Sequence, residues 1–185
     1  MAHRVCPWWL GYFLASPLRT LVQNPDQILS PYVQEGMTAL DVGSAMGYFS
    51  IPMAKLVGPS GKVICVDLQE KMIASLKKRI AKAGLTDRVE TRVCENDSLK
   101  IENLANTIDF ALAFALVHEV PNKQKLFNQI CQTLKPGKLL MISEPAGHVP
   151  RKDFDQTIGI AMENGFELSD DLTIKRSHTC LLKKK

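Results

Sequence analysis

The most informative stretch of the chain is LDVGSAMGYF, residues 40–49. An apolar run at 37–42 leads into it and predicts a strand, and the residues at 48–57 then follow with helical spacing. Glycines at positions 43 and 47 allow a sharp turn and a close approach of the backbone to a ligand at the start of the helix. The stretch therefore predicts a strand, a ligand-binding turn and a helix.

The order of residues in this turn disfavours two common nucleotide-binding motifs. The dinucleotide fingerprint G-x-G-x-x-G/A requires a glycine where Ala45 stands and a small residue where Tyr48 stands. A phosphate-binding loop requires a Lys-Ser or Lys-Thr pair, which the stretch lacks. Asp41 puts a negative charge beside the turn, which suits an ammonium and a sulfonium better than a pyrophosphate. A nicotinamide-dependent dehydrogenase is therefore the weaker interpretation.

A second strand is predicted by the β-branched run KVICVD at 62–67. It ends in Asp67, about 20 residues beyond the glycine turn, where a carboxylate accepts hydrogen bonds from ribose hydroxyls in nucleotide-binding folds. Leu68 would offer an apolar face to a base. The alternative is that Asp67 only caps the helix that begins near Glu70.

Strand-like and helix-like segments alternate through the rest of the chain. Helices are predicted at 70–83, 122–134 and 151–164, and further strands at 89–93, 108–115, 138–143, 166–174 and 177–183. The last two strands are too close together for a crossover helix, so we expect them to pair antiparallel. The predicted fold class is α/β, a doubly wound, seven-stranded, mostly parallel Rossmann-like sheet with the last strand antiparallel.

Composition favours one ordinary globular domain, with 45% apolar and 23% charged residues among 185. We expect the domain at 36–185, preceded at 1–35 by an arm and short helices. The net charge of +4 is mild. We therefore interpret the lysine-rich face of the helix at 70–83 as solvent-exposed surface rather than as part of a nucleic-acid-binding groove. No apolar run approaches the roughly 20 residues needed to span a membrane. The five cysteines form no CxxC pair, which suggests reduced thiols in a cytoplasmic protein and no metal site.

Several segments resemble the class I S-adenosylmethionine-dependent methyltransferases, in particular the small-molecule, methyltransferase type 11-like enzymes. The matching segments are 40–47, Val66-Asp67-Leu68, FALAFALVHEVPN at 110–122 and LKPGKLL at 134–140. They occur in the order and spacing of the family. The resemblance implies a transferase that uses S-adenosylmethionine as its cofactor.

The resemblance also implies which residues bind the cofactor. Those expected around its methionine part are Asp41, Gly43, Ser44 and Gly47. Those expected around its adenosine are Asp67, Leu68, Glu95, Asn96 and, through its backbone, Phe114. Two departures matter. Ala45 replaces a glycine of the family and is tolerable at negative φ. The third motif is imperfect, so either Glu95 or Asp97 faces adenine.

The methyl acceptor is expected beyond the fourth and fifth strands, where His118, Glu119 and Glu144 are the candidate catalytic residues. Methyl transfer is an in-line displacement, and a base is needed only when the nucleophile must lose a proton. The alternative is that His118 only hydrogen-bonds within its loop. The segment 114–117 lacks the Asn/Asp-Pro-Pro-aromatic turn of enzymes that methylate adenine or glutamine nitrogens. A small-molecule acceptor is therefore expected, and a non-catalytic cofactor-binding regulator is the alternative.

The N-terminal arm contains the apolar run CPWWLGYF at 6–13. Pro7, the two tryptophans and the lack of an A-x-A site disfavour a secretion signal. So much apolar surface needs a partner. The arm could close over the acceptor as a lid formed by residues 5–14, pack as core at the sheet edge, or mediate a dimer or membrane contact. In related enzymes this segment often forms a cover.

Overall fold

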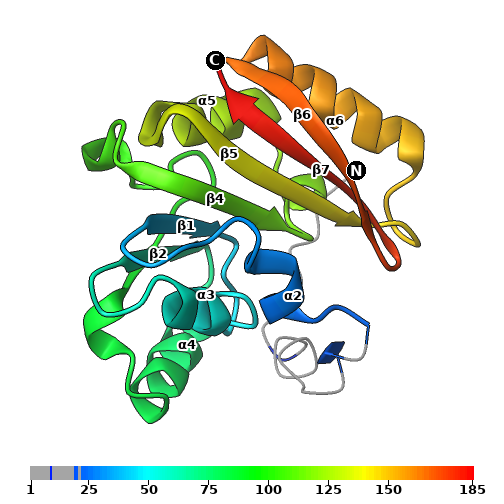
Figure 1. Cartoon of the computed structure of the whole chain (residues 1–185). Coiled ribbons are helices and arrows are strands. Elements are labelled where there is room, and N and C mark those ends of the chain that lie inside the picture. Colours follow the sequence, from blue (N-terminus) through cyan, green and yellow to red (C-terminus); the bar gives the residue numbers. More distant parts are fainter. Residues whose placement is uncertain (1–8, 10–18, 21) are drawn as a thin grey trace.

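The computed structural model describes Trp9, Arg19, Thr20 and residues 22–185. Within these residues the chain forms a seven-stranded sheet with strand order β3-β2-β1-β4-β5-β7-β6 (Figure 1). The strands are β1 (Thr38–Val42), β2 (Lys62–Asp67), β3 (Val89–Val93), β4 (Ile108–Phe114), β5 (Leu134–Pro145), β6 (Phe166–Ile174) and β7 (Ser177–Lys184). Strands β1 to β5 pair parallel, whereas β7 lies between β5 and β6 and is antiparallel to both. The predicted fold class, including the antiparallel last strand, is confirmed.

Helices cover both faces of the sheet, as Figure 1 shows. They are α2 (Pro25–Leu29), α3 (Ser50–Leu56), α4 (Glu70–Lys82), α5 (Lys123–Thr133) and α6 (Arg151–Glu163), with short 3-10 turns η2 (Thr86–Arg88), η3 (Glu102–Leu104) and η4 (Val117–Glu119). Helices α2, α3 and α4 pack on one face, and α5 and α6 on the other. Each predicted helix boundary after residue 60 lies within one residue of the observed one.

Both faces of the central strands are buried, which explains their continuous apolar sequence. In β1, Leu40 and Val42 pack in the cluster that contains α5 and α6, while Ala39 packs in the cluster that contains α2 to α4. A strand buried on both faces needs apolar residues at successive positions rather than at alternate ones. Leu29 and Val33 are also buried, so the segment before β1 contributes to the second cluster.

The strand order places a crevice at the carboxyl ends of β1 and β4. From β1 the chain continues outward to β2 and β3, and it then returns to place β4 on the other side of β1. The loops after β1 and β4 therefore diverge over opposite faces of the sheet, and such a switch point is where open α/β sheets bind ligands. The residues expected to bind the cofactor follow these strands.

Two expectations differ from the structure or fall outside it. The strand predicted at 138–143 begins earlier, at Leu134, because the Pro136-Gly137 segment is accommodated by a register shift against β4 instead of ending the strand. The arm at 5–14 lies outside the described residues except for Trp9, whose surface is 59% exposed, so the lid stays a prediction. Among the described residues no helix is long and apolar enough to cross a membrane.

Candidate functional site

A cavity of about 460 Å³ opens at the carboxyl ends of the parallel strands. Its walls come from the segment between β1 and α3, the end of β2, the loops after β3 and β4, and the N-terminal half of α5, together with Arg19. The size falls in the range of about 300–1,000 Å³ that is typical of small-molecule sites. The residues expected to bind the cofactor that line it are Asp41, Gly43, Ser44, Asp67, Leu68, Glu95, Asn96 and Phe114.

The turn after β1 is held by backbone hydrogen bonds and by left-handed residues. The amides of Gly43 and Ser44 donate to the carbonyl of Val66 at 2.9 and 3.1 Å. Gly43 has φ +75°, and Ala45 has φ +45°. The expectation of negative φ at Ala45 is therefore wrong: this alanine occupies a conformation that costs an L-residue about 1–2 kcal/mol. Its amide donates to Oδ2 of Asp67 at 2.8 Å, which offsets part of that strain.

Gly43 and Gly47 each lie too close to a neighbouring side chain to carry a Cβ, and the neighbour differs between the two. A Cβ on Gly43 would lie 2.8 Å from Cδ1 of Leu116, at the cavity wall. A Cβ on Gly47, which has φ +85°, would lie 2.3 Å from Cδ1 of Leu76 on α4. Gly47 does not line the cavity, unlike the other three residues expected around the methionine part. In the structure Gly47 lets the turn before α3 lie closely against Leu76 of α4.

Asp67 ties the ends of two strands together beside the cavity. Its side chain is buried, and its two carboxylate oxygens accept the amides of Ala45 and Gln69, each at 2.8 Å. Burial raises the pKa of Asp67, and the backbone hydrogen bonds from Gln69 and Ala45 act in the opposite direction. The alternative interpretation of Asp67 as a helix cap is wrong, because the N-cap residue of α4 is Gln69 and no side chain among the described residues caps the first turn of this helix. Asp67 instead anchors the glycine turn and lines the cavity.

Two polar groups under the turn are buried in unusual states. Burial raises the pKa of Asp41 to about 7, in spite of the hydrogen bond from the Ser50 hydroxyl at 2.5 Å, and the charge of Asp67 raises it further. The Ser44 hydroxyl oxygen is buried and has no hydrogen-bond partner among the described residues. Both residues line the cavity, so a ligand with a cation and a hydrogen-bonding group would satisfy them.

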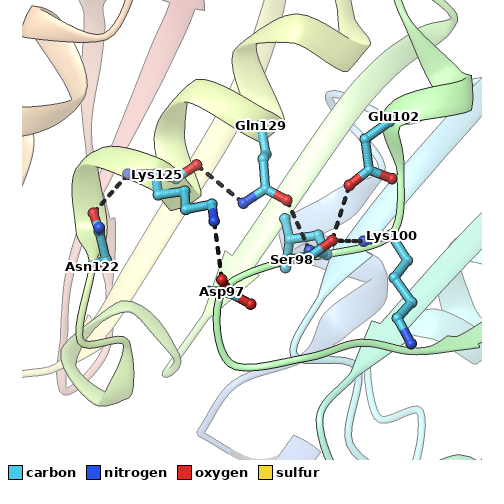
Figure 2. Close-up of polar contacts among 8 residues, drawn as sticks. Asp97, Ser98, Lys100, Glu102, Asn122, Lys125 and Gln129 are labelled. Atoms are coloured by element: carbon cyan, nitrogen blue, oxygen red, sulfur yellow. Dashed lines mark hydrogen bonds and ion pairs between the residues drawn. The ribbon is translucent and has the colours of Figure 1, made fainter.

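The loop after β3 is fastened to helix α5 across the cavity rim, as Figure 2 shows. The Lys125 ammonium lies 3.2 Å from Oδ2 of Asp97, and the Leu99 amide donates to Oε1 of Gln129 at 2.8 Å. Asn122 caps α5 by accepting the Lys125 amide at 2.9 Å. Glu95, which pairs with Lys100 at 2.7 Å, lines the cavity, and so does Asp97. The structure therefore brings both candidate adenine-edge carboxylates to the same wall.

The three candidate catalytic residues form a chain that ends at the cavity. Glu144, at the end of β5, is buried and accepts the Val117 amide at 2.7 Å. Its other oxygen contacts Nδ1 of His118, and Nε2 of His118 lies 3.9 Å from Oε1 of Glu119. Of these three, Glu119 lines the cavity, whereas His118 and Glu144 lie behind it. Burial lowers the pKa of His118, but the hydrogen bond and charge of Glu144, with the charge of Glu119, outweigh it, so the pKa is raised.

Sequence reasoning missed Tyr48 and Phe49 in the aromatic wall of the cavity and the cation beside them, and it expected only backbone contacts from Phe114. The Arg19 guanidinium carbon lies 4.4 Å from the ring centroid of Tyr48 and 5.5 Å from those of Phe49 and Phe114. All four residues line the cavity. Arg19 precedes the first strand and belongs to no motif, so no local signal could have pointed to it. Tyr48 and Phe49 follow the glycine turn directly, and their position was the available signal.

In the described part of the chain, no three His, Cys, Asp or Glu side chains are grouped so as to hold a metal ion. Cys65, Cys94, Cys131 and Cys180 are free thiols, and of these Cys94 lines the cavity. Burial, with a smaller contribution from the charge of Asp67, raises the pKa of the Cys94 thiol to about 11.

Comparisons with known proteins agree on one family. Residues 33–178 match the family described as "Methyltransferase domain". The arsenite methyltransferase of Halobacterium salinarum is 31% identical over 118 residues, which are 64% of this chain and 29% of that protein. The ubiquinone/menaquinone biosynthesis C-methyltransferase UbiE of Hydrogenovibrio crunogenus is 29% identical over 112 residues, 60% of this chain and 43% of that protein. The chain thus spans less than half the length of either relative.

A solved structure agrees with the same architecture over nearly the whole chain. The SAM-dependent methyltransferase from Aquifex aeolicus superimposes with a TM-score of 0.88 at 23% identity, covering 98% of this chain and 100% of that one. At this identity the likeness establishes the shared fold.

Proposed function

This chain belongs to the methyltransferase domain family, and we propose that it transfers a methyl group from S-adenosylmethionine to a small-molecule acceptor that Glu119 deprotonates. The observation that carries the proposal is the cavity of about 460 Å³, in which Glu119 shares a wall with the residues expected to bind the cofactor. A non-catalytic cofactor-binding regulator is less favoured, because relatives named as methyltransferases match the chain.

The cavity residues fit S-adenosylmethionine, which supplies a methyl group on a positively charged sulfur. Asp41 is a buried carboxyl whose ionised form a nearby cation would favour. The Ser44 hydroxyl is buried without a partner among the described residues, and a polar ligand atom would satisfy it. Asp67 is fixed by two backbone amides, so its remaining lone pairs are held in place for the ribose hydroxyls.

The charges of the cavity support a small acceptor over a nucleic acid. Its acidic lining residues are Asp41, Asp67, Glu95, Asp97 and Glu119, whereas its basic lining residues are Arg19 and Lys125. Nucleic-acid sites instead gather Lys and Arg along a phosphate path. An acidic cavity with an aromatic wall suits a compact acceptor.

The roles proposed for the catalytic candidates follow from their order in space. S-Adenosylmethionine held by the cavity residues would supply the methyl group to a lone pair of the acceptor, and its sulfur would keep the electron pair of the broken carbon–sulfur bond. Glu119 faces the cavity and takes the proton that the acceptor loses. His118 lies behind Glu119, and Glu144 fixes its ring through Nδ1, so this pair is expected to tune the charge at Glu119.

The names of the two relatives indicate different substrates. The cysteine content of the cavity is relevant to one of these substrates, arsenite. Arsenic compounds bind thiolates, yet among the described cysteines Cys94 alone lines the cavity, and burial raises its thiol pKa. We therefore propose an organic acceptor. Four free thiols among the described residues also fit the cytoplasmic location that we propose.

The test is methyl transfer from radiolabelled S-adenosylmethionine to fractionated small-molecule extracts, compared with RNA and protein fractions. We expect label in a small-molecule fraction, and label confined to RNA or protein would contradict the proposal. With the acceptor in hand, Glu119→Gln should lower kcat by about 10²–10⁴-fold. Its affinity for S-adenosylhomocysteine should stay within about twofold. Glu163→Gln, an exposed change at the end of α6, is the matched control.

A further inference from the structure

Arg19 is a cation held in a fixed position at one end of the cavity. Its Nε donates to Oε1 of Gln23 at 2.9 Å, and the backbone carbonyl of Gln23 accepts the Tyr48 hydroxyl at 2.7 Å. The amide nitrogen of the Gln23 side chain donates to the Ser177 hydroxyl at 3.0 Å, which ties the arrangement to the start of β7. Burial lowers the pKa of Arg19, but a guanidinium remains charged in proteins. Several contacts therefore fix the position of the Arg19 charge.

The strand order shows at which end of the cavity Arg19 lies. Its guanidinium is over Phe114, at the end of β4, and over Tyr48 and Phe49, which follow the turn after β1. The residues expected at the ribose and adenine, Asp67 and Glu95, follow β2 and β3, on the far side of β1. Arg19 therefore lies at the end where the methionine part and the acceptor meet.

The other charged residues that line the cavity indicate which ligand group Arg19 binds. Of the two basic lining residues, Lys125 pairs with Asp97 at the opposite, adenine end. A carboxylate that enters the other end meets Asp41 and Glu119, and Arg19 is the basic lining residue described there. We propose that Arg19 binds a ligand carboxylate at this end, belonging either to the methionine part of the cofactor or to an anionic acceptor. This inference rests on the proposed function of the cavity.

The position of the Arg19 guanidinium is compatible with binding a ligand carboxylate. Cation–π attraction acts on the charge of the guanidinium as a whole, whereas a carboxylate binds the N–H groups of the guanidinium, so the two interactions are compatible. Arg19 is also partly buried beside these rings, and the lower local dielectric strengthens a charge-assisted hydrogen bond. An ion pair at the exposed rim would be worth much less.

The test uses three variants and two pairs of probes. The variants are Arg19→Gln, Arg19→Lys and, as a control, Arg151→Gln, whose guanidinium lies 5.7 Å from the Phe154 ring on α6, away from the cavity. The first pair of probes is S-adenosylhomocysteine and methylthioadenosine, which lacks the amino-acid part. The second pair is benzoate and benzamide, titrated into protein saturated with S-adenosylhomocysteine. Calorimetry gives the Kd values, and thermal unfolding checks that each variant is folded.

If the carboxylate is the cofactor's, Arg19→Gln weakens S-adenosylhomocysteine about tenfold to a hundredfold, and methylthioadenosine changes less than about twofold. If it is the acceptor's, cofactor affinity is retained, while the wild-type preference for benzoate over benzamide disappears in Arg19→Gln. Arg19→Lys should recover part of either loss. Equal weakening of both nucleosides, or no change with any probe, overturns the inference. Failure of wild-type protein to bind S-adenosylhomocysteine would instead overturn the proposed cofactor site.

Discussion

Ala45 is a strained residue of the candidate site, and a single substitution to glycine would relieve the strain. Its φ of +45° is in the left-handed region, where the methyl group is disfavoured and glycine is not. We expect Ala45→Gly to raise the free energy of unfolding by about 1 kcal/mol, since the strain removed exceeds the entropy that glycine loses. Urea unfolding measures the change. Ala74→Gly, at an exposed position inside α4, should lower stability by about 0.5–1 kcal/mol, and equal effects of the two changes would contradict the argument.

Asp41 is expected to release a proton when the cofactor binds. Its pKa is about 7 because burial disfavours the ionised form, so near pH 7 about half of the free protein carries this proton. The ammonium of the ligand favours the ionised carboxylate and therefore lowers the pKa on binding. The release should be about half a proton at pH 7 and should vanish about two units higher.

Calorimetric titration of S-adenosylhomocysteine in phosphate and in Tris measures this release, because the two buffers take up protons with different heats. The apparent enthalpies should differ near pH 7 for the wild type and agree for Asp41→Asn. Identical enthalpies for the wild type in both buffers would show that Asp41 does not change its protonation state on binding, which contradicts the prediction.

The packing of the turn before α3 against Leu76 of α4 depends on the absence of a side chain at position 47. A methyl group there would meet Leu76 at 2.3 Å, and the φ of +85° adds backbone strain. We expect Gly47→Ala to lower the free energy of unfolding by about 2–4 kcal/mol. Gly159→Ala, inside α6 with no atom within 4 Å of the new carbon, should instead raise it by about 0.5–1 kcal/mol. Similar destabilisation by both changes in thermal unfolding would refute the packing explanation.

Strands and helices could be predicted because local sequence determines them in this fold. β2 and β3 begin and end at the predicted residues, since their β-branched runs are bounded by polar turns. The start of β5 could not be predicted, because Pro136-Gly137 is also a common turn signal. Only the neighbouring strand β4, which shifts its register there, keeps the segment in the sheet. The boundary is thus set by tertiary pairing rather than by the residues themselves.

The candidate site also contains some residues that could be predicted from the sequence and others that could not. The residues in the turn after β1 and at the end of β2 could be predicted from their spacing along the sequence, because folds of this type bind ligands at the carboxyl ends of these strands. The φ of Ala45 and the packing role of Gly47 could not, because they depend on Asp67 and on Leu76 of another helix. Arg19 could not be found either, because tertiary contacts alone bring it over Phe114.

The molecule as a whole gathers its ligand contacts from segments far apart in the sequence. The cavity joins the turns after β1, β2, β3 and β4 with the first turn of α5, so one ligand contacts both sides of the switch point. The loop after β3 depends on α5 through Asp97 and Gln129, as Figure 2 shows. A ligand in this position should therefore stabilise the entire domain and not one loop.

S-Adenosylhomocysteine should raise the melting temperature of the whole domain, and NAD should not. A ligand that binds only the folded state adds about 2.7 kcal/mol of stability at a concentration one hundred times its Kd. Asp41, beside the turn, would oppose the pyrophosphate of NAD, whereas it favours the ammonium of S-adenosylhomocysteine.

Asp67→Asn tests the same binding from inside the cavity. The amide cannot accept from both Ala45 and Gln69 with its two terminal atoms, so we expect some loss of intrinsic stability. Because the ribose loses a charged acceptor as well, affinity for S-adenosylhomocysteine should fall by about 1.5–3 kcal/mol, and the ligand-induced shift in melting temperature should shrink. Asp87→Asn, at an exposed position in η2, should keep the full shift. If Asp67→Asn lowers the melting temperature yet keeps the wild-type shift, Asp67 serves only to fix the turn, and the ribose must be bound elsewhere.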